Sequence, residues 1–251
     1  MRAIIIGAGR GQRLMPTTAN APKCFAEVQG KRILDWTVEA LRAGGATEIC
    51  FIGGYRIESV QREYPDFVFR HNPDWESNNI LVSLMCAEDL MGEPFLTTYS
   101  DILFTPDIVA GLARSPADIA LGIDTDWREH YKPRTQHPPH DAEKAITAAG
   151  RVERVYRTIP YADATGEFIG VAKFSQRGAA LLREHYHRRR NECWDKPYRE
   201  AAQFQKAYLI HLFQDMIEQG VPFGHADTHG NYREIDTQED LNLAQHGWLK
   251  K

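Results

Sequence analysis

The sequence predicts an α/β protein with a mostly parallel sheet covered by helices on both faces. Short apolar runs rich in branched residues alternate with longer segments whose apolar residues recur at helical spacing. Glycine pairs close two of these segments, at Gly44-Gly45 and at Gly53-Gly54. Because a helix-length segment separates successive strands, we expect right-handed crossovers between parallel strands.

Residues 1–125 supply most of the expected sheet. Apolar residues three and four positions apart predict a helix over 33–41, and another over 80–90 that ends before Pro94. The expected strands are 3–6, 49–52, 67–69, 95–99 and 119–123.

The pattern changes in residues 126–251. Residues 128–143 are rich in histidine, proline and charge, which favours a long loop or lid. Neither an internal repeat nor a low-complexity linker is found, so we expect a single domain over residues 1–251 with a smaller substrate-facing subregion. Strands are expected at 152–156 and 168–174, helices at about 176–189 and 202–219, and strands at 223–226 and 233–235 before a closing helix.

Composition excludes several classes of protein. The 251 residues are 43% hydrophobic and carry a net charge of -4, which argues against nucleic acid as an obligate partner. The N-terminal apolar run is too short for a signal peptide, and no run approaches the ~20 apolar residues of a membrane span. We therefore expect a cytoplasmic protein. The four scattered cysteines form no C-x-x-C pair and indicate neither a zinc site nor a disulfide framework: Cys24, Cys50, Cys86 and Cys193.

A glycine-rich loop, residues 7–14, follows the first expected strand directly. Its bare backbone N–H groups can approach an anionic oxygen without interference from side chains. Gln12 stands where a dinucleotide fingerprint has its third glycine, and the Gly-x-x-x-x-Gly-Lys-Ser/Thr phosphate loop is absent. Two cations, Arg13 and Lys23, frame the loop; each alone could be a solvated surface charge, but together with the glycines they indicate a phosphate-binding site.

This segment resembles the signature of the sugar-phosphate nucleotidylyltransferases, most closely the cytidylyltransferases that act on phosphocholine and related small phosphates or phosphonates. The resemblance is dense over about the first 45 residues and recurs to the C-terminus. The matching residues are Gly7-Ala8-Gly9-x-Gly11-x-Arg13-Leu14-x-Pro16, Thr18, Pro22-Lys23 and Gly30-Lys31-x-Ile33-Leu34.

The resemblance implies a Rossmann-like, GT-A-like nucleotidyltransferase fold with a nucleotide-binding half (1–125) and an acceptor-binding, metal-completing half (126–251). It implies that an NTP, with CTP favoured, and a phosphorylated or phosphonate acceptor are exchanged for a nucleotide-linked product and pyrophosphate. By position, Arg13 would hold the β- and γ-phosphates, and Lys23 would neutralise the α-phosphate. The loop residues Gly7, Ala8, Gly9 and Gly11 would contact the nucleotide.

Two aspartates are candidate magnesium ligands. Nucleotidyl transfer needs no covalent nucleophile, and its electrostatic barrier is lowered by a divalent cation with cationic side chains. Asp101 follows an expected strand, where ligands bind in open parallel sheets, and Asp236 ends a short strand before the closing helix. In the family that the sequence resembles, aspartates at these two positions hold Mg²⁺. Asp101 could instead cap a turn, and Asp236 could cap the helix.

The sequence says less about which residues recognise the base and the acceptor. Asn78 and Asn79, after Ser77, either cap a helix or contact the nucleobase. Lys144 could meet the acceptor phosphate and Glu167 a hydroxyl or ammonium group, although both also suit a surface. Five aromatic residues could line a site for a quaternary ammonium, although most large aromatics belong to the core: Trp127, Tyr131, Trp194, Tyr198 and Tyr232.

Other readings are weaker. No cysteine or carboxylate near His130, His137 and His140 completes a zinc site in the sequence, and the basic run at 185–190 reads as a solvated helix face. The alternative functions are a sugar-1-phosphate nucleotidylyltransferase using UTP, dTTP or GTP, a dinucleotide-binding oxidoreductase and a non-catalytic regulatory domain. The base, the acceptor and the formation of a homodimer stay open.

Overall fold

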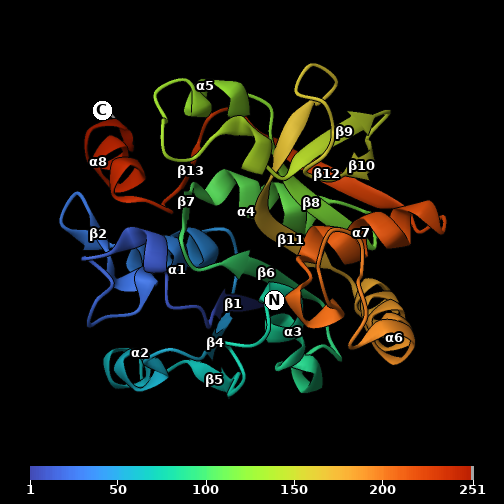
Figure 1. Ribbon diagram of the computed structural model, residues 1–251, viewed down its shortest axis with the longest axis horizontal. Helices are drawn as coiled ribbons and strands as arrows, with labels where there is room; N and C mark the ends of the chain where they lie inside the picture. The colour runs from blue at the N-terminus through green and yellow to red at the C-terminus, as the bar shows by residue number, and fades with distance from the viewer. Residues whose placement is uncertain (250–251) are drawn as a thin grey trace.

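The computed structural model describes residues 1–249, which form a nine-stranded sheet with helices packed on both faces (Figure 1). Across the sheet the strands are β5 (Val68–His71), β4 (Glu48–Gly53), β1 (Arg2–Gly7), β6 (Phe95–Tyr99), β11 (Gly166–Phe174), β8 (Ile119–Asp124), β12 (Phe223–Thr228), β10 (Arg151–Val155) and β9 (Lys144–Ala148).

Two small sheets and eight α-helices complete the fold. In the described residues, none of the helices has the length and apolar character needed to cross a membrane. The small sheets pair β2 (Glu27–Val28) with β3 (Lys31–Arg32) and β7 (Ile102–Phe104) with β13 (Tyr232–Glu234). The helices are α1 (Ile33–Ala43), α2 (Ile57–Glu63), α3 (Ile80–Met85), α4 (Pro106–Arg114), α5 (Trp127–Tyr131), α6 (Gln176–Cys193), α7 (Leu209–Glu218) and α8 (Gln238–Gly247).

The large sheet is mixed, so the expectation of a mostly parallel sheet is wrong. Strands β5, β4, β1 and β6 are parallel, as are β8 and β12, but β11 runs antiparallel to both β6 and β8. Strand β10 is antiparallel to both β12 and β9. The segment between β10 and β11 contains no helix, so the chain makes no crossover there. Every residue of β11 is buried, Glu167 and Lys173 included, so the strand has no exposed face whose alternation would indicate an antiparallel neighbour.

Most predicted elements occur close to their expected positions. The helix expected at 202–219 is α7, which starts only at Leu209, after a 3₁₀ turn at Phe204–Lys206. The helix expected at 80–90 ends at Met85 and is followed by another 3₁₀ turn. The expected loop at 128–143 overlaps the short helix α5. Helices α2 and α4, and strands β2, β3, β7 and β9, were not predicted.

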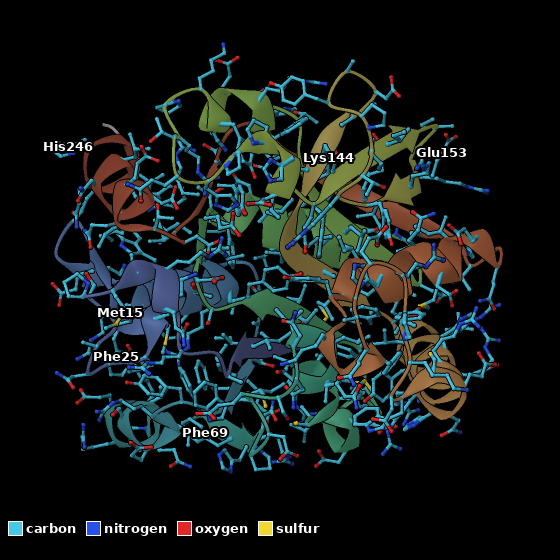
Figure 2. All side chains as sticks on the ribbon, in the orientation of Figure 1. Met15, Phe25, Phe69, Lys144, Glu153 and His246 are labelled. Atoms are coloured by element: carbon cyan, nitrogen blue, oxygen red, sulfur yellow. The ribbon has the colours of Figure 1, made fainter. Side chains whose placement is uncertain are left out.

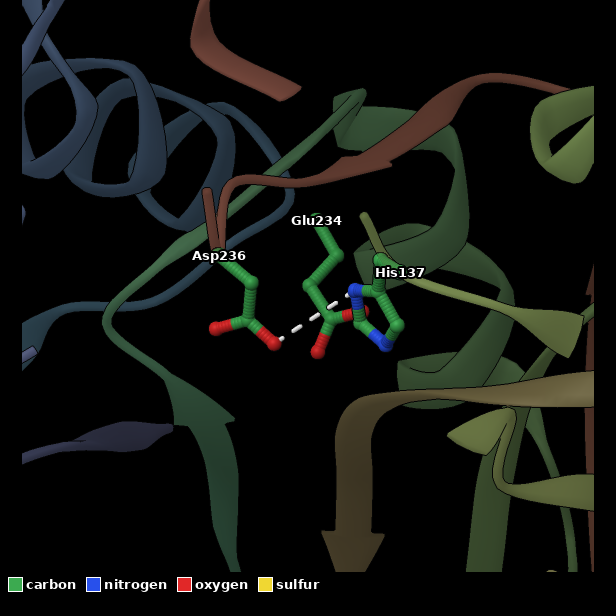
Figure 3. Close-up of side chains that lie close together, drawn as sticks. All are labelled: His137, Glu234 and Asp236. Atoms are coloured by element: carbon green, nitrogen blue, oxygen red, sulfur yellow. Dashed lines mark ion pairs between the residues drawn. The ribbon is translucent and has the colours of Figure 1, made fainter. Parts of the chain in front are cut away.

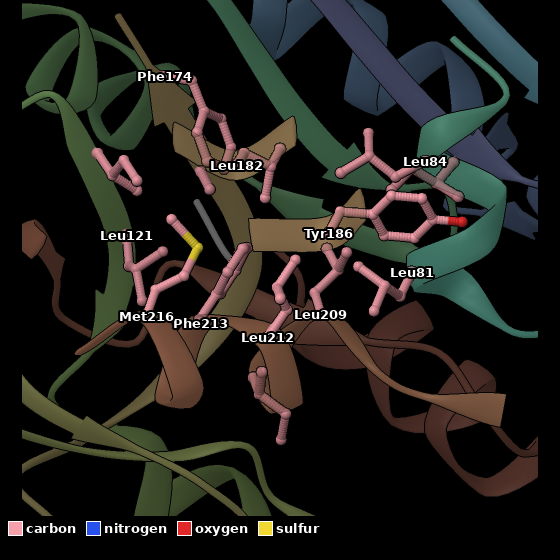
Figure 4. Close-up of a cluster of buried hydrophobic side chains, with 14 of the residues drawn as sticks. Leu81, Leu84, Leu121, Phe174, Leu182, Tyr186, Leu209, Leu212, Phe213 and Met216 are labelled. Carbon is pink, nitrogen blue, oxygen red and sulfur yellow. The ribbon is translucent and has the colours of Figure 1, made fainter. Parts of the chain in front are cut away.

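The two faces of the sheet are buried by different helices. Alternate residues of β1 point to opposite sides, so that Ile4 belongs to one apolar cluster and Ile5 to another. Helices α3, α6 and α7 pack on the first face, where Leu182 and Phe213 are buried with Phe174 (Figure 4). Helices α1 and α4 pack on the second face. The sheet is therefore a rigid floor whose loops can carry the site.

Helix α8 returns the C-terminus to the N-terminal half and lies beside β2 (Figure 1). A third apolar cluster joins Leu14 of the glycine-rich loop to Ile235, Leu241 and Trp248. The helix begins at a capping box, in which the Thr237 hydroxyl accepts a hydrogen bond from the Asp240 backbone N–H. This packing brings the residues around 236 to the loop after β1.

Replacement of Phe213 by alanine tests the first cluster. The ring is fully buried and packs against Phe168, Phe174 and Phe223. We expect Phe213→Ala to lower the free energy of unfolding by about 3–5 kcal/mol, measured by urea denaturation. Leu249→Ala is the control, because Leu249 is 47% exposed and should change stability by less than about 0.5 kcal/mol. Equal effects of the two substitutions would contradict this packing.

Candidate active site

A cavity of about 600 Å³ opens beyond the ends of β1 and β6, a volume typical of small-molecule sites. One wall is formed by the glycine-rich loop and Lys23, and the opposite wall by residues of the second half, including Glu143 and Glu167. The cavity therefore lies where ligands bind in open α/β sheets, at the carboxyl ends of strands.

Close packing requires two of the loop's glycines, Gly7 and Gly11. A Cβ atom on Gly7 would lie 2.5 Å from the Phe51 ring. Gly11 has a φ of +68° and lies against Lys23, whose side-chain carbons would be 2.9 Å from an added Cβ. A Cβ on Gly9 would meet no atom within 4 Å. The loop thus supports Lys23 at Gly11 and leaves open space at Gly9; Gly7, Ala8, Gly9 and Gly11 all line the cavity.

Four charged residues far apart in the sequence meet at this loop. The Lys23 ammonium donates to Asp101 Oδ2 at 2.7 Å and to Asp236 Oδ1. Arg13 Nη2 donates to Asp236 Oδ2 at 2.6 Å. The structure therefore brings together all four residues that the sequence singled out as the charged centre.

The small sheet of β7 and β13 brings the two aspartates together. Asp101 precedes β7 and Asp236 follows β13, and in the antiparallel register Ile102 pairs with Glu234. The Ile235 backbone N–H donates to the Asp101 carbonyl at 2.9 Å. Because Thr237 is the N-cap of α8, the Asp236 carboxylate is free to pair with Lys23 and Arg13.

The cluster is charged although it is largely buried. Burial alone would lower the pKa of Lys23, but Asp101 and Asp236 outweigh burial and raise that pKa. Burial would raise the pKa of Asp236, but Lys23 and Arg13 hold it below its ordinary value. The site therefore presents fixed charges of both signs to a ligand.

His137 and Glu234 adjoin Asp236, and the three could hold a metal ion (Figure 3). His137 Nδ1 lies 3.5 Å from Glu234 Oε2 and 3.6 Å from Asp236 Oδ2. Sequence reasoning dismissed His137 because no cysteine or carboxylate completed a ligand set around the histidines, and the fold supplies two carboxylates from β13 and the residues after it. Burial and Arg134 lower the pKa of His137, while burial and Asp236 raise that of Glu234.

The two asparagines have different structural roles. Asn79 is the N-cap of α3, where its side chain accepts a hydrogen bond from the Ile80 backbone N–H at 2.8 Å. Asn78 exchanges side-chain hydrogen bonds with Asn72 at 2.8 and 2.9 Å. Both asparagines line the cavity, so capping accounts for Asn79 and leaves Asn78 without a capping role.

The two residues expected on the acceptor side are placed differently. Glu167 lines the cavity, is 3% exposed and accepts a hydrogen bond from the Tyr131 hydroxyl at 2.6 Å. Burial raises its pKa to about 7. Lys144, labelled in Figure 2, is buried outside the cavity lining. Its ammonium donates to three backbone carbonyls at 3.3–3.4 Å. The structure therefore does not bring the Lys144 ammonium to the acceptor side.

Sequence reasoning assigned no role to four residues of the cavity lining, which are Tyr99, Glu143, Arg157 and Tyr208. Tyr99 donates its hydroxyl proton to Glu143 Oε2 at 3.0 Å. The guanidinium of Arg157 lies over the Tyr208 ring, with 4.0 Å between Cζ and the ring centroid. Glu143 could have been found from its place before Lys144, but Arg157 and Tyr208 belong to no recognised pattern.

The aromatic lining also differs from expectation. Of the five aromatic residues considered, only Tyr232 lines the cavity, and Trp127 and Tyr131 are buried behind it in a separate cluster. Trp194 and Tyr198 pack instead against Phe204. The other aromatic residues that line the cavity are Trp75, Tyr99, Phe168 and Tyr208.

Comparison with known proteins bears out the resemblance to nucleotidyltransferases. The family model of the MobA-like NTP transferase domain matches residues 3–157, more than half of the chain. The chain is 28% identical to the CTP:phosphoglutamine cytidylyltransferase of Campylobacter jejuni, over 97% of this chain and 98% of that protein. It is 29% identical to the choline-phosphate cytidylyltransferase of Streptococcus pneumoniae, over 67% of this chain and 80% of that protein.

The fold is similar to that of a solved structure. The inositol-1-phosphate CTP transferase from T. maritima superposes with a TM-score of 0.72, covers 99% of this chain and 98% of its own, and is 19% identical. This likeness supports a nucleotidyltransferase α/β fold.

The raised pKa of Glu167 predicts a pH-dependent difference in stability. Between the ordinary pKa of 4.5 and about 7, the folded state keeps a proton that the unfolded chain has lost. The resulting stabilisation is complete below pH 4.5 and is lost as the pH rises through 7. Relative to Glu167→Gln, the wild type should lose up to about 3 kcal/mol of unfolding free energy between pH 5 and 8, measured by urea denaturation. A difference that does not vary with pH would contradict the assignment.

Proposed function

The chain belongs to the family of MobA-like NTP transferase domains, and from this premise we propose that it is a magnesium-dependent cytidylyltransferase. It transfers the cytidylyl group of CTP to a small phosphorylated or phosphonate acceptor and releases pyrophosphate. The observation that carries the proposal is the meeting of Arg13, Lys23, Asp101 and Asp236 at one wall of the cavity.

The relatives support the choice of nucleotide and of acceptor class. The two similar curated enzymes and the similar solved structure are all named for CTP or cytidylyl transfer. Their named acceptors are phosphoglutamine, choline phosphate and inositol 1-phosphate, each a phosphate on a small polar carrier. The cavity volume of about 600 Å³ suits a nucleotide with such an acceptor.

The reaction depends on neutralising the negative charge of the phosphates rather than on transferring a proton. An oxygen of the acceptor phosphate forms a bond to the α-phosphorus of CTP while the bond from that phosphorus to pyrophosphate breaks. The acceptor oxygen is already anionic at neutral pH, so no strong general base is required. The groups that matter are those that neutralise the approaching and leaving phosphates.

Arg13 and Lys23 supply that neutralisation. The Arg13 side chain is 60% exposed, so its guanidinium can bind the β- and γ-phosphates with few contacts to break. Lys23 is held between Asp101 and Asp236, and its ammonium exchanges one carboxylate for an oxygen of the α-phosphate when CTP enters. Gly11 keeps the Lys23 stem in place beside the loop.

The carboxylates fit a hard divalent cation. Asp101 and Asp236 both contact the same ammonium, so their oxygens lie close enough to share one cation. Magnesium prefers one or two carboxylates together with phosphate oxygens and water, and Glu234 and His137 adjoin the same place. Mg²⁺ held there would supply positive charge to the phosphates. Asp101 and Asp236 would bind and orient it.

The proposal is tested by a substrate panel. Each of CTP, UTP, GTP, ATP and dTTP is incubated with Mg²⁺ and with phosphoglutamine, phosphocholine, 2-aminoethylphosphonate or glucose 1-phosphate, and pyrophosphate is measured. We expect release with CTP and at least one small phosphate or phosphonate acceptor, and no release when acceptor or Mg²⁺ is omitted. Turnover confined to UTP, dTTP or GTP with the sugar phosphate would show a sugar-1-phosphate nucleotidylyltransferase instead.

Two aspartate variants test the metal-binding assignment. Asp101→Asn and Asp236→Asn each remove one charged ligand, so we expect kcat/KM to fall by about 100-fold or more while the circular dichroism spectrum is retained. Asp107→Asn is the matched control, because Asp107 is exposed on α4 away from the cavity. Full activity of Asp101→Asn would refute the assignment.

A further inference from the structure

Arg157 lines the cavity, and most of its N–H donors have no strong hydrogen bond within residues 1–249. It lies in the connection between β10 and β11 and lines the cavity. Its Cζ lies 4.0 Å from the centre of the Tyr208 ring, a cation–π contact that positions the guanidinium. The five N–H groups of an arginine side chain therefore depend on other partners.

Few of those donors are paired. Arg157 Nη2 reaches Glu143 Oε1 at 3.4 Å, longer than the 2.7–2.9 Å usual for a charge-assisted hydrogen bond. Arg157 Nε is buried and has no hydrogen-bond partner within residues 1–249. A buried donor without a partner is costly, and a planar guanidinium with free donors is suited to a carboxylate held by two parallel hydrogen bonds.

The other cations of the cavity serve the nucleotide. In the described residues, the lysine and arginine side chains that line the cavity are Arg13, Lys23 and Arg157. Arg13 and Lys23 pair with the two aspartates. Lys144 donates to backbone carbonyls outside the cavity lining. An anionic group on the acceptor, other than its phosphate, would thus find Arg157.

Two buried acidic side chains in the same cavity lining, one of them in contact with Arg157, favour a positive group on the same acceptor. Glu143 and Glu167 are 7% and 3% exposed and line the cavity. Glu143 has the Tyr99 hydroxyl and the long contact to Arg157, and Glu167 has the Tyr131 hydroxyl. Each of these side chains therefore has few hydrogen-bond donors among residues 1–249, and a ligand ammonium in the cavity would supply more.

We propose that Arg157 is the specificity residue that binds a carboxylate of the acceptor, whose ammonium lies at Glu143 and Glu167. The acceptor is then a phosphorylated zwitterion, such as a phosphorylated amino acid. This inference rests on the proposed function and narrows its acceptor class. An acceptor with an ammonium but no carboxylate, such as phosphocholine, would leave Arg157 unpaired.

The test compares phosphoglutamine with an analogue that lacks only the α-carboxylate, N-phospho-4-aminobutanamide. With saturating CTP, we expect the wild type to favour phosphoglutamine by more than about 10-fold in kcat/KM, mainly through KM for the acceptor. In Arg157→Gln this preference should fall below about 3-fold, and in Arg157→Lys it should be intermediate because lysine keeps the charge and loses the fork. The wild type should also have a lower kcat/KM for the phosphoglutamine analogue that lacks only the α-amino group than for phosphoglutamine.

Arg154→Gln is the matched control, because Arg154 is exposed on β10 and does not line the cavity. It should keep the full preference for phosphoglutamine. An equal loss of kcat/KM for both acceptors in Arg157→Gln would assign Arg157 to the phosphate or to the fold and overturn the proposal. So would a wild type that turns over both acceptors equally well. No turnover of CTP with any acceptor would instead refute the proposed function, and this acceptor class with it.

Discussion

The pairing of Lys23 with Asp101 and Asp236 is the interaction on which the rest of the site depends. It joins three segments far apart in the chain, and an ion pair with so little exposure persists only where several partners compensate the loss of water. The fold supplies those partners through local devices. Gly11 makes room for the Lys23 stem, the β7–β13 pairing places the aspartates side by side, and α8 packs its end of the chain against the glycine-rich loop.

The antiparallel strand β11 brings residues of both halves of the chain to one cavity. It enters between β6 and β8, so that Phe168 of the second half packs edge-on against Tyr99 of the first half. In the proposed function, the loop after β1 binds the nucleotide, and β11 and its neighbours bind the acceptor. A fully parallel sheet made of crossovers would have required a helix before β11, where this chain has the connection that carries Arg157.

The sequence predicted those site residues whose position depends on a pattern within a few neighbouring residues. Gly7, Gly11, Lys23 and Asp101 were identified because the strand, the bare loop and the strand end each leave a signature within a few residues. The direction of β11 was not predictable, since a strand buried on both faces shows no alternation. Sequence could not place His137, Glu143 and Arg157, because their neighbours come from distant segments of the chain. Lys144 stood at a position that suggested acceptor binding, but nearby backbone carbonyls hold its ammonium.

The most direct test of the account follows the phosphorus atoms of CTP through one reaction. CTP labelled at the α-phosphate or at the γ-phosphate is incubated with the enzyme, Mg²⁺ and phosphoglutamine, and the products are separated. The charge cluster predicts that the α-label appears in a cytidylyl-linked acceptor and the γ-label in pyrophosphate, in equal amounts. Release of the γ-label as inorganic phosphate, or of the α-label as free CMP in the presence of acceptor, would contradict it.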